Sequence, residues 1–364
     1  MKVAYNGIKV QKRGADMTES YVIEVGSDTV KMAYIDAEGN TQVFHRLFDR
    51  WKIDSSVLFY KDTAVIGEYA KLAGIFYENR YVNLTIHDLI KKEPLIETDG
   101  KEYTGSDILA IILQELVENA NMKFKKQIKD IILLDSAYND SWCQAVYKAA
   151  AAKAGLNCIE IATEELCIAD YVCPLPSEGE SLLVYKLGAE ECSAVLLTEE
   201  KRMWKIAEYE FSDCCAGNSY DKELQRYFVE KSRVYAGYRK NFTYAESANL
   251  LNNIQAAREY LTDHEETVVT AAAEDHDLLF DFQREEMLDI LIGKIQEGLD
   301  IVAACLNGKC GTGVDTAVLC GHLCFLPEIE QEFRKRFPYI KNIIAEPDAI
   351  LHSAVHKALK ILRG

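Results

Sequence analysis

Two short stretches of the chain carry the residues best suited to chemistry, and both follow one design. The first is Val22–Asp28 and the second is Val184–Glu190. Each has an apolar segment, a glycine, a small residue and an acid, then a second apolar segment, and the copies align without a gap. Glycine tolerates the dihedral angles of a tight strand turn, and such a turn aims backbone N–H groups at one point, as phosphate-binding loops do. One copy alone is typical of an ordinary β-hairpin, but two copies at matching places favour a pair of phosphate-facing turns.

The size and charge of the chain limit its class. Its 364 residues exceed what one hydrophobic core usually supports, so we expect two lobes. A formal charge of −17 disfavours nucleic acid and anionic membranes as partners, because this surface would repel both. The sequence has no uncharged stretch long enough to span a membrane and no signal-peptide core at its start. The eleven cysteines are scattered without a CxxC pair, which indicates reduced thiols in a cytoplasmic protein.

The expected elements follow the same order in both halves. In the first half, strands near the first copy precede a helix that begins near Thr104, and then come a strand at 131–134, a helix at 139–155, a strand at 158–161 and a helix at 163–171. The second half repeats the order with strands at 182–187, 192–198, 203–211 and 316–320, helices at 218–231, 245–262 and 284–306, and an added strand pair at 267–272 and 278–282. Strands that alternate with helices predict parallel pairing and α/β sheets.

A cluster of helix and strand breakers, Cys173–Gly179, marks the division between the halves. We expect a first lobe at residues 18–180, preceded by an extension at 1–17, and a second lobe at 181–364. The second lobe is expected to have two further features, a helical insert at 218–283 and a final helix at 347–362 that packs back on the first lobe. The predicted architecture is two βββαβα repeats in tandem around a central cleft.

Three stretches of sequence are similar to those of one known family. Leu133–Ala145, followed by Ala154–Leu156 and Thr163–Glu165, resembles the run V-P-A-Y-F-N-D-S-x-R-Q-A…A-G-L…N-E-P of the seventy-kilodalton heat-shock chaperones (DnaK-like). Ser56–Lys71 resembles S-V-V-x-F…L-I-G-x-x-A-K, and Glu346–Asp348 resembles N-P-D-E. The resemblance implies the nucleotide-binding domain of that family, with the actin-like ATPase fold, ribonuclease-H-like repeats, and a cleft for ATP or ADP with Mg²⁺.

The chain departs from the family pattern at the positions that carry chemistry. The family's first turn, D-L-G-T-T, is Glu24–Asp28 here, and its second turn, D-L-G-G-G-T-F-D, is Lys186–Ser193. A metal-linked aspartate of the family is therefore Lys186, and its catalytic lysine aligns with His87. We regard Glu24, His87 and Lys186 as degenerate catalytic positions, assign no metal ligand, and expect Lys186 to pair with Glu24 or Asp28.

The resemblance also carries the nucleotide-contacting positions over to this chain. The family's adenosine loop, G-G-S-T-R-I-P, is Gly321–Pro327 here. In the helical insert that brackets the base, Arg258 and Thr262 match a lysine and a serine, while Glu259 replaces an arginine. The candidate nucleotide-binding residues are Gly26, Ser27, Asp28, Gly188, Gly217, Arg258, Thr262, Gly321 and Asp348.

Two other patterns are weaker. His352 and His356 lie four apart on the last predicted helix, but the glutamate of an H-E-x-x-H zinc motif is absent, so an amphipathic helix explains them better. Gly308–Gly313 has the composition of a phosphate loop, but it follows a helix and precedes a strand, the reverse of the order that a P-loop requires.

These observations favour a chaperone-family nucleotide-binding module with weak ATP binding and little or no hydrolysis. Such a module would act through conformation or through contacts with protein partners. The first alternative is a slow but functional ATPase domain of a chaperone. A small-molecule kinase of the same fold is disfavoured, because the sequence offers no credible acid to activate a substrate hydroxyl.

Overall fold

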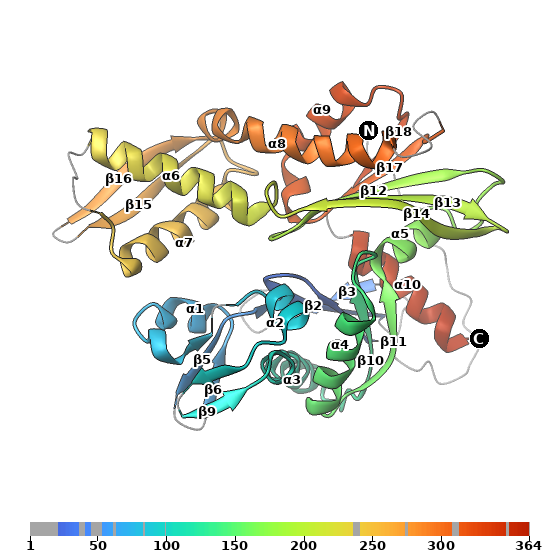
Figure 1. The fold of residues 1–364 in the computed structure, drawn as a ribbon, viewed down its shortest axis with the longest axis horizontal. Coiled ribbons are helices and arrows are strands. Elements are labelled where there is room, and N and C mark those ends of the chain that lie inside the picture. The colour runs from blue at the N-terminus through green and yellow to red at the C-terminus, as the bar shows by residue number, and fades with distance from the viewer. Residues whose placement is uncertain are drawn as a thin grey trace.

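The computed structural model describes most of the chain. The described residues are 21–35, 41–44, 53–60, 63–82, 84–98, 100–235, 241–273, 276–307, 313–346 and 349–363. The predicted extension at 1–17 lies outside them, as does Asp348. Two sheets and their helices form two layers that face each other (Figure 1).

The first sheet is built from the N-terminal part of the chain. Its strands run in the order β11-β10-β1-β2-β3, and β4 also pairs with β2. β1 pairs antiparallel with β2 and parallel with β10, and β10 pairs parallel with β11. The bounds are β1 Tyr21–Val25, β2 Thr29–Ile35, β3 Thr41–Val43, β4 Ile53–Asp54, β10 Asp130–Asp135 and β11 Asn157–Thr163.

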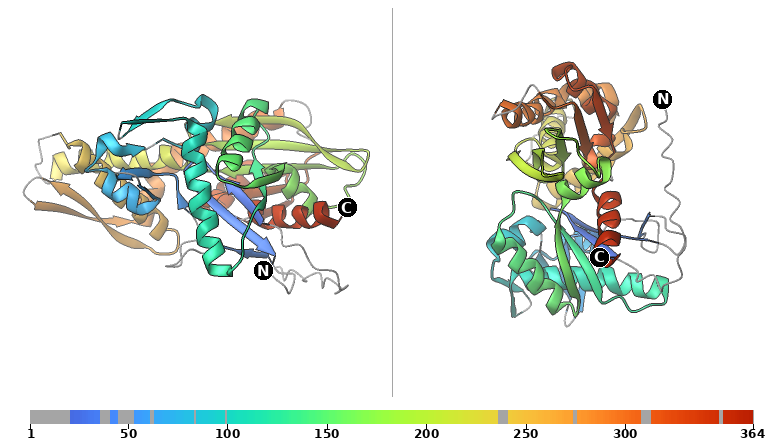
Figure 2. Two further views of the ribbon diagram at one scale, coloured as in Figure 1. Left: turned by 90° about the horizontal axis from the view of Figure 1, so that it is seen from below. Right: turned by 90° about the vertical axis from the view of Figure 1, so that its right-hand side faces the viewer.

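Helices cover both faces of this sheet. α3 (Gly105–Phe124) and α4 (Ser141–Lys153) share one hydrophobic core with it, and α5 (Glu164–Val172) and α10 (Ala349–Arg363) share another. α3 begins with a capping box, in which the Thr104 hydroxyl accepts from the Asp107 N–H and the Asp107 carboxylate accepts from the Thr104 N–H. The long α3 crosses under the sheet in Figure 2.

Short elements occupy residues 57–103, and the sequence pattern is least informative at residues 78–103. β5 pairs with both β6 and β7, and β8 pairs with β9. The bounds are β5 Val57–Tyr60, β6 Thr63–Ile66, α1 Glu68–Gly74, η1 Glu78–Arg80, β7 Tyr81–Val82, α2 Ile86–Lys92, β8 Ile96–Thr98 and β9 Lys101–Tyr103. α2 carries His87 and Lys91, which line a pocket beside the two glycine turns.

The second sheet has the order β14-β13-β12-β17-β18. Its bounds are β12 Ser181–Leu187, β13 Cys192–Glu200, β14 Met203–Ser212, β17 Thr316–Cys320 and β18 Asn342–Ala345. α8 (Arg284–Asn307), η2 (His322–Phe325) and α9 (Pro327–Arg336) pack on it. A helical and hairpin unit at one end of Figure 1 shares the core of the second sheet. It consists of α6 (Gly217–Tyr235), α7 (Tyr244–Tyr260) and the hairpin β15 (Glu266–Ala273) and β16 (His276–Gln283).

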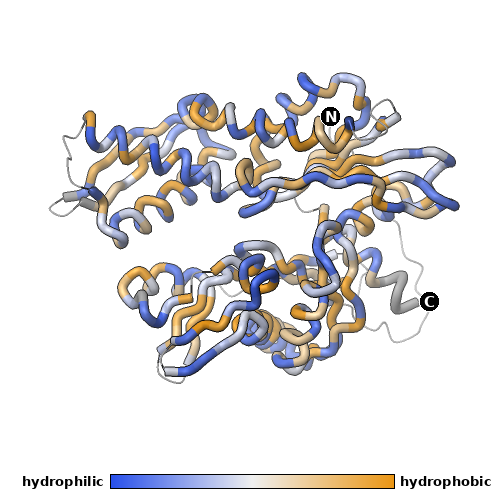
Figure 3. The backbone as a smooth tube through the Cα atoms, viewed as in Figure 1, coloured by the Kyte–Doolittle hydropathy of each residue, from blue (hydrophilic) through white to orange (hydrophobic). Residues whose placement is uncertain are grey.

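Each sheet has a core of its own, and a third core joins the two. This shared layer contains Val22 and Leu134 of the first sheet, Val184 and Val318 of the second, and apolar residues of α5 and α10. α10 therefore contacts α5 and the first two strands of the first sheet, although it is the last helix of the chain. Hydrophobic residues concentrate along the strands of both sheets (Figure 3). The architecture confirms the predicted α/β fold with two facing sheets.

Candidate functional site

The two glycine turns have the same backbone geometry. The first turn, Glu24–Thr29, joins β1 to β2, and the second turn, Lys186–Glu191, joins β12 to β13. The Gly26 N–H donates to the Thr29 carbonyl at 2.9 Å, and the Gly188 N–H donates to the Glu191 carbonyl at 2.9 Å. A Cβ on Gly26 would lie 3.1 Å from the Thr29 oxygen, and one on Gly188 would lie 2.9 Å from the Glu191 oxygen. Close backbone approach therefore explains the glycine in both turns.

Both turns line one cleft, whose volume counted to its mouth is about 990 Å³. Most of the candidate residues lie in its wall: Glu24, Gly26, Ser27, Asp28, Lys186, Gly188, Gly217, Arg258 and Gly321. Thr262 is not a lining residue, and its hydroxyl donates to the Arg258 carbonyl at 3.4 Å. The walls of the cleft come from both halves of the chain.

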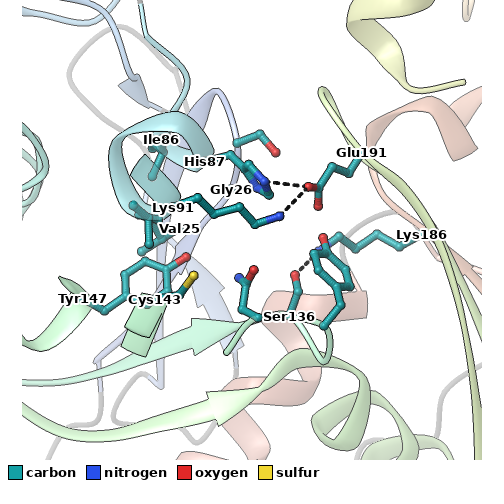
Figure 4. A pocket seen from close by; sticks show the side chains of 14 residues that line it. Val25, Gly26, Ile86, His87, Lys91, Ser136, Cys143, Tyr147, Lys186 and Glu191 are labelled. Atoms are coloured by element: carbon teal, nitrogen blue, oxygen red, sulfur yellow. Dashed lines mark hydrogen bonds and ion pairs between the residues drawn. The ribbon is translucent and has the colours of Figure 1, made fainter. Parts of the chain in front are cut away.

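His87 lines a smaller adjoining pocket of about 380 Å³ (Figure 4). Gly26 of the first turn and Lys186 and Glu191 of the second turn line it as well. His87 and Lys91 come from α2, where they are one helical turn apart, so both side chains point at the same space.

Lys186 is paired, but the predicted partner was wrong. Its Nζ lies 2.5 Å from Glu164 Oε2 and donates to Ser136 Oγ at 2.8 Å. Glu24 instead interacts with Lys31 on the neighbouring strand, at 3.4 Å. The reason is the position of α5, which begins at Glu164 and shares a hydrophobic core with β12, so that its first carboxylate lies beside Lys186. Burial alone would lower the pKa of Lys186, but the nearby Glu164 outweighs it and the pKa lies well above the usual value.

Glu191 contacts three residues of the opposite wall. Its Oε1 lies 2.9 Å from His87 Nε2 and 3.4 Å from Lys91 Nζ, and its carboxylate accepts a hydrogen bond from Tyr138. Burial opposes ionisation of Glu191, but the hydrogen bonds from His87 and Tyr138 and the nearby positive charges prevail, and its pKa falls to about 2. Glu191 therefore remains an anion at neutral pH.

Two further contacts connect the turns to opposite walls. Glu190 hydrogen bonds to Thr85, the N-cap residue of α2. Asp28 of the first turn hydrogen bonds to Asn218, the second residue of α6. Burial raises the pKa of both carboxyl groups.

The wall formed by the helical insert is held by a buried ion pair. Arg258 donates through Nε to Asp221 Oδ1 at 2.6 Å and through a terminal nitrogen to Oδ2 at 3.1 Å. This fork geometry fixes the guanidinium plane, so Arg258 presents a rigid surface to the cleft. Across the mouth, Lys71 Nζ donates to Gln255 Oε1 at 2.8 Å.

Further carboxyl groups surround the Lys186–Glu164 pair. Burial raises the pKa of Asp135 to about 6 and that of Glu165 to about 7. Sequence reasoning missed the roles of Glu164, Tyr138 and Lys91. Sequence signals could have found two of them. Glu164 lies in the stretch that resembles the family's N-E-P, and Lys91 follows His87 by four residues, which places both on one face of a helix.

Two features are absent from the part of the chain that the structure describes, a metal-binding group and a membrane-spanning helix. No group of three or more His, Cys, Asp or Glu side chains there is arranged to hold a metal ion. No described helix is long and apolar enough to cross a membrane. His352, from the histidine pair in the last helix, has its Nδ1 2.7 Å from Glu346.

The two facing sheets with their glycine turns at a shared cleft define the class, which is the actin-like ATPase fold. The family model described as Hsp70 protein matches residues 56–354, and the chain belongs to the Hsp70 family. Chaperone protein DnaK of Thermotoga petrophila and that of Thermotoga maritima are each 22% identical over 359 residues, which is 94% of this chain and 59% of the relative. DnaK of Metamycoplasma hominis is 23% identical over 211 residues, 57% of this chain and 35% of the relative. The chain thus spans 59% of the length of its Thermotoga relatives.

Proposed function

We propose that this protein is a nucleotide-binding module of the Hsp70 family with a degenerate ATP site and little or no ATP hydrolysis. It acts through its conformation or through contacts with protein partners, and it resides in the cytoplasm. The observation that carries this proposal is the position of Lys186, a cation paired with Glu164 where the family pattern has a metal-linked aspartate. Gly26, Ser27, Asp28, Gly188, Gly217, Arg258 and Gly321 are the residues proposed to contact any nucleotide that does bind.

The residues at the turns do not fit a Mg²⁺–triphosphate group. A metal ion placed near Lys186 would meet an ammonium group instead of a carboxylate. Phosphate near the second turn would meet the anionic Glu191, which already accepts from His87 and Tyr138. Phosphoryl transfer in this fold depends on neutralising phosphate charge with metal and backbone donors. We therefore derive no catalytic step through Mg-ATP at this site.

The expected loss of binding free energy sets the nucleotide affinity that we propose. Losing three or four charge-assisted hydrogen bonds, at about 1.5–3 kcal/mol each, removes roughly 5–10 kcal/mol of binding free energy. A loss of that size moves a micromolar site to millimolar or weaker. The alternative, a slow ATPase domain, is favoured by Gly26, the glycine that the first turn keeps, and by the cleft that both turns line. Weak residual binding of ATP or ADP is compatible with both.

The division into lobes also remains a proposal. We place the boundary at 180/181, with the helical insert at 218–283 in the second lobe. Two sheets with separate cores on either side of the boundary support it. The match covers 59% of the DnaK relative from Thermotoga petrophila. We propose that this chain, too, contacts protein partners, and we assign no surface to that contact.

The test is calorimetric titration of the purified chain with Mg-ATP and with Mg-ADP, together with a phosphate-release assay. We expect millimolar or weaker binding and no turnover above the protein-free rate. A Kd of about 10 μM or tighter, about 7 kcal/mol, with steady phosphate release would establish the slow ATPase instead.

A further inference from the structure

The charged side chains of the second turn all reach the opposite half of the molecule. Lys186 contacts Glu164 and Ser136. Glu190 contacts Thr85, and Glu191 contacts His87, Lys91 and Tyr138. Every one of these partners belongs to the part of the chain that precedes residue 173, whereas the turn itself belongs to the second sheet.

Lys186 and Glu191 of the second turn each face groups of opposite charge in the first half. The second turn inserts a cation, Lys186, between acidic and hydroxyl groups of the first half, and an anion, Glu191, between basic and hydroxyl groups of the same half. Figure 4 shows the two side chains leaving neighbouring points of one wall and ending against different groups of the other. Both pairs are largely shielded from water, since Glu164 is 3% exposed and Glu191 is 6% exposed. Salt screens such pairs much less than it screens surface pairs.

An aromatic contact lies next to the pairs. The rings of Tyr138 and Phe211 stack with centroids 5.0 Å apart, and Lys91 Nζ lies 5.8 Å and 5.5 Å from the two centroids. Tyr138 comes from the loop after β10 and Phe211 from the end of β14. This stack also joins the two halves, so an apolar contact lies beside the charged ones.

From this geometry we infer that the second turn is a built-in clasp, in which Lys186 and Glu191 stand in for a bound metal ion and phosphate and hold the two halves closed without any nucleotide. The inference rests on the proposed function, because both concern the cleft between the two glycine turns. It goes further than weak nucleotide binding, because it also predicts which conformation the chain adopts without nucleotide. The closed conformation is the resting state, and an event that opens the cleft must first break these two pairs.

The test measures closure in the absence of nucleotide. Hydrogen–deuterium exchange is followed in peptides from the two turns and α2 for the wild-type chain, for Glu191→Gln and for Lys186→Gln/Glu191→Gln. Small-angle scattering of the same samples reports the overall dimension. We expect exchange to be at least tenfold faster in these peptides of the double variant, with a larger radius of gyration, and an intermediate effect for Glu191→Gln.

A matched control removes an ion pair that lies within one half. Glu286→Gln breaks the contact with Lys231 at 3.0 Å, between α8 and α6 of the second half, and should leave exchange in the two turns and α2 unchanged. Circular dichroism establishes that each variant is folded, and Glu191→Gln alone decides the matter if the double variant is not. Unchanged exchange and scattering in every folded clasp variant would refute the clasp. Tight Mg-ATP binding by the wild type would refute the proposed function alone, since the exchange experiment contains no nucleotide.

Discussion

The two glycine turns share a backbone and differ in what their side chains hold. In the first turn, Glu24 interacts with Lys31 of the same hairpin at 3.4 Å. In the second turn, the equivalent residue is Lys186, which pairs with Glu164 of the other half of the chain at 2.5 Å. Thr29 of the first turn likewise corresponds to Glu191 of the second. The comparison teaches that a repeated backbone can be kept while the charge at its first position changes from a local contact, Glu24 with Lys31, to a link between two halves, Lys186 with Glu164.

The largest expected effect is a difference in unfolding free energy between variants of Lys186 and Lys31. Lys186→Met leaves the buried Glu164 without its cation, which costs about 3–5 kcal/mol of unfolding free energy. Lys31→Met should cost about 1 kcal/mol, because burial already raises the pKa of Glu24 and the carboxyl group can take up a proton. Urea unfolding of both variants at pH 7 measures the difference.

A double variant tests the cause of that loss. Lys186→Met with Glu164→Gln removes the uncompensated charge and should recover most of the stability lost in Lys186→Met. Equal losses for Lys186→Met and Lys31→Met, with no recovery in the double variant, would contradict the distinction between the two turns.

The second prediction compares the acids of the two turns as pH changes. Glu191 has a pKa of about 2 in the folded chain, below its ordinary 4.5, so it contributes stability above pH 4.5 that is lost as pH falls towards 2. Glu24 has a raised pKa, so the folded chain retains a proton that the unfolded chain has released, and stability falls as pH rises past about 4.5.

The two glutamine variants should therefore differ in sign. Glu191→Gln should lower the unfolding free energy at pH 7 by up to about 3 kcal/mol, and the gap to wild type should shrink by pH 3. Glu24→Gln should leave the stability at pH 7 unchanged or slightly higher. Urea midpoints between pH 3 and 7 provide the measurement, and parallel profiles for the two variants would be the contrary result.

The sequence predicted the repeated backbone but not the contacts that cross it. The gapless alignment of the two turns located both strand pairs, and the predicted strand 316–320 agrees with β17. The partner of Lys186 was missed because Glu164 is 22 residues away in sequence, and no local pattern reports such a contact. Residues 78–103 were uninformative because strands of two or three residues, such as β7 and β8, are too short to show a period. The family resemblance was confirmed by the Hsp70 match, whereas the assignment of site residues rests on that resemblance, residue by residue, and stays a prediction.

The smallest expected effect concerns the glycines themselves. Gly188→Ala places a Cβ 2.9 Å from the Glu191 oxygen, a backbone atom that must move, whereas Gly26→Ala leaves 3.1 Å to the Thr29 oxygen. We expect Gly188→Ala to cost about 1–3 kcal/mol and Gly26→Ala to cost less. Gly293→Ala is the control, because it lies in α8 with open space around its Cβ and should stabilise the chain by about 0.5–1 kcal/mol. Moving the Glu191 carbonyl also moves the carboxylate that meets His87, so Gly188→Ala should speed hydrogen exchange in α2 more than Gly26→Ala does. The first turn reaches α2 through one backbone bond, in which the Ile86 N–H donates to the Ser27 carbonyl at 2.6 Å. If the two turn variants were equal in urea midpoint and in exchange, the second turn would be no more than a hairpin, and its contacts with the opposite wall would contribute nothing to closure.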